Sequence, residues 1–170
     1  QWKNLRTYVS ILGEYSTYMT EKQKLMTLRF LYELLAHRES DIRNQAGEII
    51  GQIIGRFNEE YKKELPSGAS LPKKKVTNLS LWETYLELIL RPDHKLTEQH
   101  KKWIGNSLKN VVDALLEYCD DRKEMYIDTL LKWYRKQNLS YQNKESLLRV
   151  SAIMDPKICT QKQIQTFLSF

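Results

Sequence analysis

Apolar residues recur along this chain at the spacing of one helix face, most clearly in residues 40–57, SDIRNQAGEIIGQIIGRF. At about 100° per residue, the large apolar side chains of this segment fall in one arc, which predicts a face directed at a core. They are Ile42, Ala46, Ile49, Ile50, Ile53, Ile54 and Phe57. Gly47, Gly51 and Gly55 form a second stripe beside this arc. We therefore expect a helix that packs against neighbours on two sides, with the three glycines as helix-packing residues.

The same periodicity predicts helices along the rest of the chain, and no stretch alternates like a strand. The expected ranges are 2–18, about 20–36, 40–57, 79–91, 97–118, 120–136, a shorter helix starting at Ser140 or Asn143, and 160–170. Ser40 is the expected cap of its helix, and 97–118 is the expected longest helix. Residues 63–78, which contain Pro66, Pro72 and Gly68, are expected to form an inserted loop.

The predicted helices come in pairs that begin near Thr20, Leu79, Asp120 and Thr160. Once about 16 loop residues are set aside, each pair occupies about 40 residues, a period typical of two-helix repeats. At 170 residues, the size favours one domain. We therefore expect residues 1–170 to form a single all-α repeat domain. The absence of an initiator methionine and the apolar end indicate a fragment of a longer chain.

Residues 40–57 resemble the second helix of a HEAT repeat. Seven positions match the pattern of that helix in register: Ile42, Arg43, Ala46, Gly47, Ile49, Ile50 and Gly51. One position departs from it, because the family commonly has an aspartate in the preceding turn, where this chain has His37. The HEAT- or armadillo-like resemblance implies a right-handed α–α superhelix, or solenoid, of about three to four hairpins. It also implies an extended surface that binds proteins and, in some members, nucleic acid.

Composition and residue spacing favour an ordinary globular protein over a membrane protein or a disulfide-rich protein. A hydrophobic content of 41% with 28% charged residues is ordinary for a globular chain. No run of about 18 apolar residues indicates a membrane span, and the Gly-x-x-x-Gly spacing of residues 47–55 lacks the apolar context of a transmembrane dimer. Cys119 and Cys159 are isolated in sequence, which favours reduced thiols in the cytoplasm over disulfides or a zinc site.

The net charge of +6 is concentrated between Lys62 and Lys109, where ten basic and five acidic residues occur. A basic region with nearby aromatic side chains, here Trp82 and Trp103, can contact phosphates. The residues that could make anion or nucleic-acid contacts are Lys73, Lys74, Lys75, Lys95, Lys101, Lys102 and Lys109. A solvated lysine-rich surface without a ligand is the other interpretation.

No catalytic constellation is visible in the sequence. His37, His94 and His100 lack the spacing of metal ligands, and neither cysteine has a histidine nearby in sequence to mark it as a nucleophile. We therefore expect no catalytic residues, no metal and no cofactor.

Three hypotheses for function remain open. The first is a non-catalytic scaffold that binds a protein partner or another domain of its own chain. The second is electrostatic, sequence-nonspecific nucleic-acid binding through residues 62–109. The third is a helical accessory region of a larger multidomain enzyme.

Overall fold

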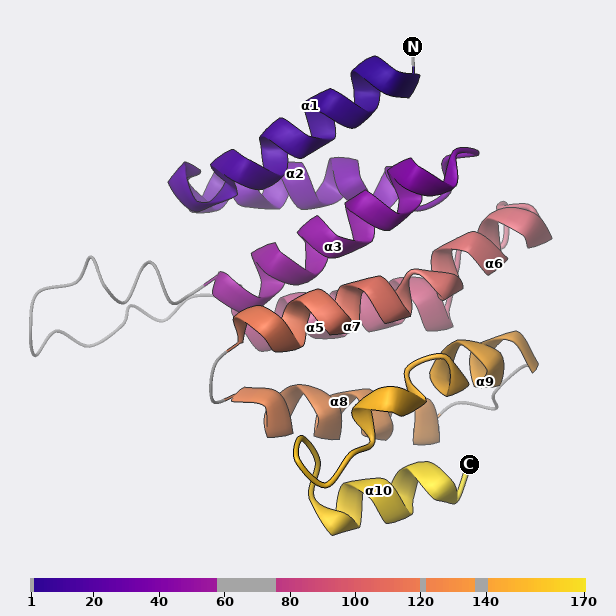
Figure 1. The fold of residues 1–170 in the computed structure, drawn as a ribbon. Coiled ribbons are helices and arrows are strands. Elements are labelled where there is room, and N and C mark those ends of the chain that lie inside the picture. The colour runs from indigo at the N-terminus through magenta and orange to yellow at the C-terminus, as the bar shows by residue number, and fades with distance from the viewer. Residues whose placement is uncertain (1, 58–75, 120–121, 137–140) are drawn as a thin grey trace, which may run out of the picture.

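The computed structural model describes residues 2–57, 76–119, 122–136 and 141–170, and within these ranges the chain is all-helical (Figure 1). The α-helices are α1 (Trp2–Tyr15), α2 (Glu21–Leu34), α3 (Ser40–Arg56), α5 (Asn78–Leu90), α6 (Glu98–Asn106), α7 (Leu108–Tyr118), α8 (Lys123–Lys136), α9 (Tyr141–Leu148) and α10 (Gln161–Leu168). Short 3₁₀ turns lie at Ser16–Tyr18 and Ser151–Ile153. The described residues contain no strand, so the all-α prediction is confirmed.

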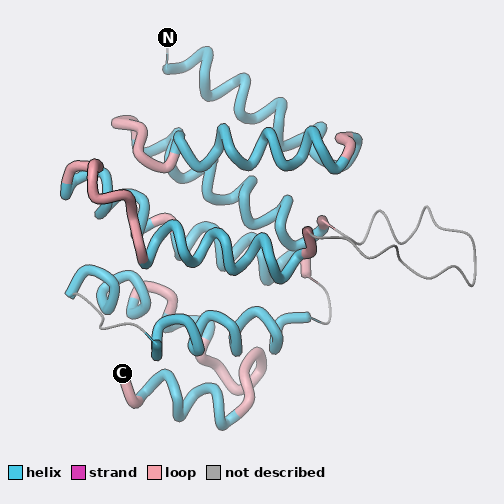
Figure 2. The backbone as a smooth tube through the Cα atoms, turned by 180° about the vertical axis from the view of Figure 1, so that it is seen from behind, coloured by secondary structure: helices cyan, strands magenta, loops and turns pink. Residues whose placement is uncertain are grey.

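The helices are stacked in chain order and divide into two layers (Figures 1 and 2). In one layer α1 packs on α3, α3 on α7 and α7 on α9; in the other α5 packs on α8, and α8 on α10. The rings of Tyr32 in α2 and Tyr85 in α5 stack with centroids 6.4 Å apart. Successive helices therefore alternate between the layers, except that α6 leads directly into α7 and also contacts α5 and α9.

Helix α3 lies at the centre of the contacts, touching α1, α2, α5 and α7. Its large apolar residues, from Ile42 to Phe57, are buried as the periodicity predicts. Helix α7 runs along the glycine stripe. A β-carbon at Gly47 would lie 3.0 Å from the Asn110 β-carbon, and one at Gly55 would lie 3.3 Å from the Leu115 carbonyl oxygen. The glycines leave room for the backbone of α7 to approach α3 closely.

The start of α3 differs from the prediction. Ser40 is the first helical residue rather than the cap; Glu39 occupies the cap position, and its side chain makes no capping hydrogen bond. The turn is held instead by Arg43, whose Nη1 donates to the carbonyl oxygens of His37 (2.7 Å) and Arg38 (2.9 Å). Asp41 lies in the first turn as expected, where a negative charge complements the helix dipole.

The single helix predicted over residues 97–118 is wrong, because the structure interrupts it at Ser107. The Ser107 hydroxyl is 2.5 Å from the Ile104 carbonyl oxygen and 2.6 Å from the Tyr85 hydroxyl. A serine that donates a hydrogen bond back to its own helix favours a bend. The contact with the Tyr85 hydroxyl of α5 holds this bend in place. The longest helix in the described ranges is α3, with 17 residues.

Several other helices begin directly after a threonine that caps them. Thr20, Thr97 and Thr160 each accept a backbone N–H at the start of α2, α6 and α10. Thr77 caps α5, so Asn78 belongs to a helix and not to the predicted loop. The rest of that loop up to residue 75, and residues 120, 121 and 140, lie outside the described ranges.

No helix in the part of the chain that the structure covers combines the length and the apolar character needed to cross a membrane.

Candidate functional site

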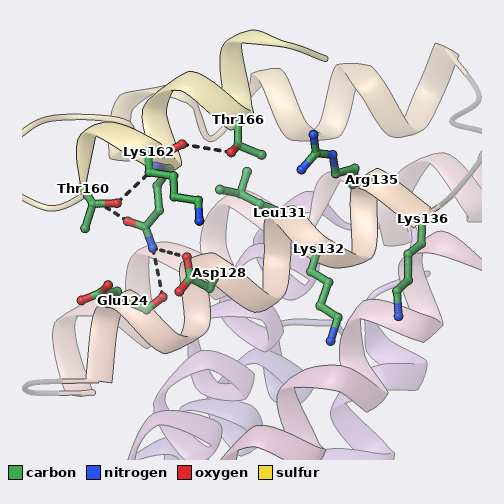
Figure 3. A pocket seen from close by; sticks show the side chains of 10 residues that line it. Glu124, Asp128, Leu131, Lys132, Arg135, Lys136, Thr160, Lys162 and Thr166 are labelled. Carbon is green, nitrogen blue, oxygen red and sulfur yellow. Dashed lines mark hydrogen bonds between the residues drawn. The ribbon is translucent and has the colours of Figure 1, made fainter.

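A groove of about 490 Å³ lies between α8 and α10 (Figure 3). We call it the α8–α10 groove. Helix α8 contributes Glu124, Asp128, Leu131, Lys132, Arg135 and Lys136, and the start of α10 contributes Thr160, Lys162, Gln163 and Thr166. The groove thus lies where the last described helix meets its neighbour.

The amphipathic pattern of α8 decides which side chains line the groove. Its apolar side is buried in the stack, through Tyr126, Ile127, Leu130, Leu131 and Tyr134. Lys132, Arg135 and Lys136 follow the i, i+3, i+4 spacing that places side chains on neighbouring positions of a helix surface. All three are exposed and border the groove.

Gln163 attaches α10 to α8 at one end of the groove. Its side-chain oxygen accepts the Thr160 backbone N–H at 2.9 Å, while its Nε2 donates to the Glu124 carbonyl oxygen (3.1 Å) and to Asp128 Oδ1 (2.6 Å). The residue is only 3% exposed, so these bonds satisfy a polar group that burial would otherwise penalise. The same contact holds the Asp128 carboxylate at this end.

The charges of α8 are separated along the groove. Glu124 and Asp128 lie at one end, where Lys162 of α10 also lies, and Lys132, Arg135 and Lys136 lie toward the other end (Figure 3). Within the described residues, none of the cations Lys132, Arg135, Lys136 and Lys162 forms an ion pair or side-chain hydrogen bond. Their charges are therefore available to a ligand that carries acidic groups.

Cys159 lies just before α10, next to the acidic end. Its Sγ donates to the Ile153 carbonyl oxygen at 2.9 Å. Burial raises the pKa of the Cys159 thiol, and the nearby Asp155 and Asp128 carboxylates add to the rise, although a hydrogen bond from the Asp155 backbone opposes it. The thiolate is disfavoured, so this cysteine does not have the electronic character of a nucleophile.

The lysines singled out in the sequence are not gathered in one place. Lys73, Lys74 and Lys75 lie outside the described residues. Lys101 pairs with Glu98 at 3.3 Å, and Lys109 pairs with Asp113 at 2.7 Å.

Their neighbours also differ. Lys101 and Lys102 border a cavity beside α9, whereas Lys109 borders a separate pocket beside α3. Lys95 is exposed in the turn before α6. Of the four described lysines, only Lys101 and Lys102 therefore share a cavity.

The histidines take local roles. His37 Nδ1 accepts the Glu39 backbone N–H at 3.0 Å, His94 is exposed beside Asp93, and the His100 ring lies 5.6 Å from the ring of Trp103. In the part of the chain that the structure describes, no three metal-binding side chains gather.

The sequence-based prediction did not include the groove. It was based on the excess of basic over acidic residues in 62–109, and the groove residues lie outside that range. The spacing of Lys132, Arg135 and Lys136 was a readable signal for one cationic helix face. Nothing local in the sequence indicates that Lys162, on another helix, joins them.

The groove presents both cationic and carboxylate side chains along one surface. Its mixed charge, with carboxylates at one end, matches a segment that is acidic in one part and basic or neutral in another. Comparisons with protein-family models, with curated protein sequences and with solved structures find no match to this chain.

Proposed function

We propose that this chain is a non-catalytic helical-repeat scaffold that binds an acidic segment of a protein partner in the α8–α10 groove. The observation that carries the proposal is the set of four groove cations, Lys132, Arg135, Lys136 and Lys162, which have no ion-pair partner among the described residues. Charges that are not neutralised within a chain are available to a complementary partner, which they attract and orient.

The repeat part of the proposal is a HEAT- or armadillo-like, right-handed stack of helical hairpins. It is supported by the alternation of most successive helices between two layers and by the close fit of α7 on the glycines of α3. In such a stack each unit contacts mainly its neighbours, and the exposed surface is extended. Cys119 and Cys159 are not joined in a disulfide, which favours a reducing compartment such as the cytoplasm.

A protein segment fits the groove better than a nucleic acid does. Glu124 and Asp128 line the same groove and would repel a continuous chain of phosphates. A peptide can place acidic residues over the cations and a basic or neutral residue beside the carboxylates. The groove lining also contains no aromatic ring on which a base could stack.

Fluorescence anisotropy with a labelled peptide tests the proposal. The probe has four glutamates followed by two lysines, and a neutral peptide of the same length and a single-stranded oligonucleotide serve as comparisons. We expect the acidic peptide to bind, to weaken as salt is added, and to lose at least about tenfold in affinity on the double change Lys132→Glu and Arg135→Glu.

The matched control is Lys22→Glu with Arg29→Glu, which reverses the same two residue types on exposed positions of α2. This control should leave the affinity unchanged. Equal losses in both double variants would mean that only net charge matters. Tighter, groove-dependent binding of the oligonucleotide would replace the proposal with nucleic-acid binding.

A further inference from the structure

A second polar pocket, of about 470 Å³, lies where α3, the bend between α6 and α7, and the end of α9 meet. We call it the α3–α7 pocket. It is lined by the cations Arg43, Lys109 and Arg149 and by the side-chain amides of Asn44, Asn106 and Asn110. No carboxylate residue lines it, and it shares no lining residue with the α8–α10 groove.

Arg43 is held in place before any ligand binds. Both hydrogens of its Nη1 are used by the carbonyl oxygens of His37 and Arg38. The guanidinium also lies over the ring of Trp103, with its central carbon 4.3 Å from the ring centroid. A guanidinium fixed in this way loses little conformational entropy when it binds a further group.

The remaining edge of this guanidinium is free in the described part of the structure. Nε and Nη2 have no hydrogen-bond partner there, and these two N–H groups point in the parallel directions that receive the two oxygens of a carboxylate. Asn110 Nδ2 donates to Asn44 Oδ1 at 3.1 Å, which leaves the Asn44 amide nitrogen as an additional donor in the pocket.

The local charge favours a monoanion. Lys109 is paired with Asp113 at 2.7 Å, and Arg149 with Glu145 at 3.2 Å. The Glu39 carboxylate acts on the Arg43 charge and also lies 3.9 Å from the exposed Arg38 guanidinium. When Arg38 is counted together with these groups, the pocket and its edge retain one net positive charge. A carboxylate would neutralise this charge, whereas a phosphate dianion would exceed it.

From this arrangement we propose that the α3–α7 pocket binds a single carboxylate group of a protein segment, received by Arg43. The three asparagine amides suit the peptide groups on either side of such a carboxylate, because an amide both donates and accepts hydrogen bonds. The carboxylate belongs either to an aspartate or glutamate side chain or to the end of a chain.

The test uses the whole ¹⁵N-labelled chain and short capped peptides that lack an acidic block, so that the groove is not their target. One pair contains a central glutamate or a central glutamine with both ends capped. A second pair is neutral in sequence and ends in a free carboxylate or in an amide. We expect saturable shifts of the Trp103 indole and Asn44 side-chain signals with the carboxylate peptides and none with their neutral partners. The stronger of the two carboxylate peptides identifies the source.

Variants separate Arg43 from the general surface. Arg43→Gln should weaken binding about tenfold, because it removes a charged hydrogen-bonding pair. The matched control is Arg56→Gln, since Arg56 lies in the same helix and stacks 4.2 Å from the Tyr118 ring centroid but does not line the pocket. If Arg43→Gln does not fold, Asn106→Asp serves, because it adds a repelling carboxylate and leaves Arg43 in place.

Two results would overturn the proposal: equal or absent shifts with charged and neutral peptides, and unchanged affinity in Asn106→Asp. The double variant Lys132→Glu with Arg135→Glu should bind these short peptides normally. Loss of the groove function and loss of the pocket are therefore distinguishable.

Discussion

Gly51 of α3 lies against the backbone of α7 at Val111, so that a β-carbon on Gly51 would overlap the Val111 carbonyl oxygen. The same β-carbon would be 2.8 Å from the Ala114 β-carbon and 2.9 Å from the Leu115 nitrogen. These neighbours are main-chain atoms and a β-carbon, which cannot rotate away. Gly51 is therefore the position on the glycine stripe where a side chain would clash most severely with α7.

Gly51→Ala should lower the free energy of unfolding by about 2 kcal/mol. Overpacking costs about 1 to 3 kcal/mol, and the up to about 1 kcal/mol that alanine gains over glycine in a helix offsets only part of it. Urea denaturation followed by circular dichroism measures the change.

Two substitutions in the same helix calibrate this result. Gly55→Ala should be near neutral, because its β-carbon would lie 3.3 Å and 3.4 Å from the nearest atoms and small movements can relieve that. Gln52→Ala, beside the stripe, should also be mild. If all three variants unfold at the same urea concentration, α7 does not contact α3 as closely as described.

Helix α3 could be predicted because its information is local. The spacing of Ile42, Ile49 and Ile53 marks the core face, and the interval of Gly47, Gly51 and Gly55 marks a second contact. The bend at Ser107 could not be predicted in this way, because it involves the Tyr85 hydroxyl, 22 residues away in sequence.

The candidate site likewise has one feature that the sequence of a single helix predicts and one that it does not. Lys132, Arg135 and Lys136 share one helix face by spacing alone. Their meeting with Lys162 depends on Gln163 reaching Asp128, 35 residues away. A sequence pattern describes the surface of one helix well, but it does not say which helix will lie opposite.

Gln163→Leu should detach α10 from α8. The change keeps a side chain of similar size but leaves the Glu124 carbonyl oxygen without the bond that Gln163 supplies, and it removes a capping contact to Thr160. We expect a loss of about 1 to 3 kcal/mol and faster hydrogen exchange in α10 than in α3. Gln165→Leu, an exposed change in the same helix, should leave both measurements unchanged. Uniformly faster exchange throughout the chain would argue against a local role for Gln163.

Two buried tyrosines should respond in opposite ways to loss of their hydroxyl groups. The Tyr134 hydroxyl is buried and has no hydrogen-bond partner among the described residues, so Tyr134→Phe should be neutral or slightly stabilising. The Tyr85 hydroxyl bonds Ser107 at 2.6 Å, so Tyr85→Phe should cost about 1 kcal/mol. Thermal unfolding of the two variants side by side measures the difference, and a larger loss in Tyr134→Phe would contradict the assigned contacts.

Alkaline pH should destabilise the protein through three tyrosines whose hydroxyl groups are shielded from water. Burial raises the pKa of Tyr32, Tyr85 and Tyr134 in the folded chain, whereas tyrosines in an unfolded chain ionise near pH 10. Above that pH the folded state binds more protons than the unfolded state, so the free energy of unfolding falls as the pH rises. The stabilising contribution is fully present below about pH 9 and is lost above it. Each such group contributes up to about 1.4 kcal/mol per pH unit.

Other groups titrate in the same range, so the difference between two proteins isolates the tyrosines. Urea denaturation of the wild type and of Tyr32→Phe with Tyr134→Phe should give similar pH dependence from pH 7 to 9. Between pH 10 and 11 the double variant should lose less stability, because two phenols that ionise only on unfolding are gone. Parallel curves over the whole range would show that these hydroxyl groups ionise as readily in the folded chain as in the unfolded one, and hence that water reaches them between the layers.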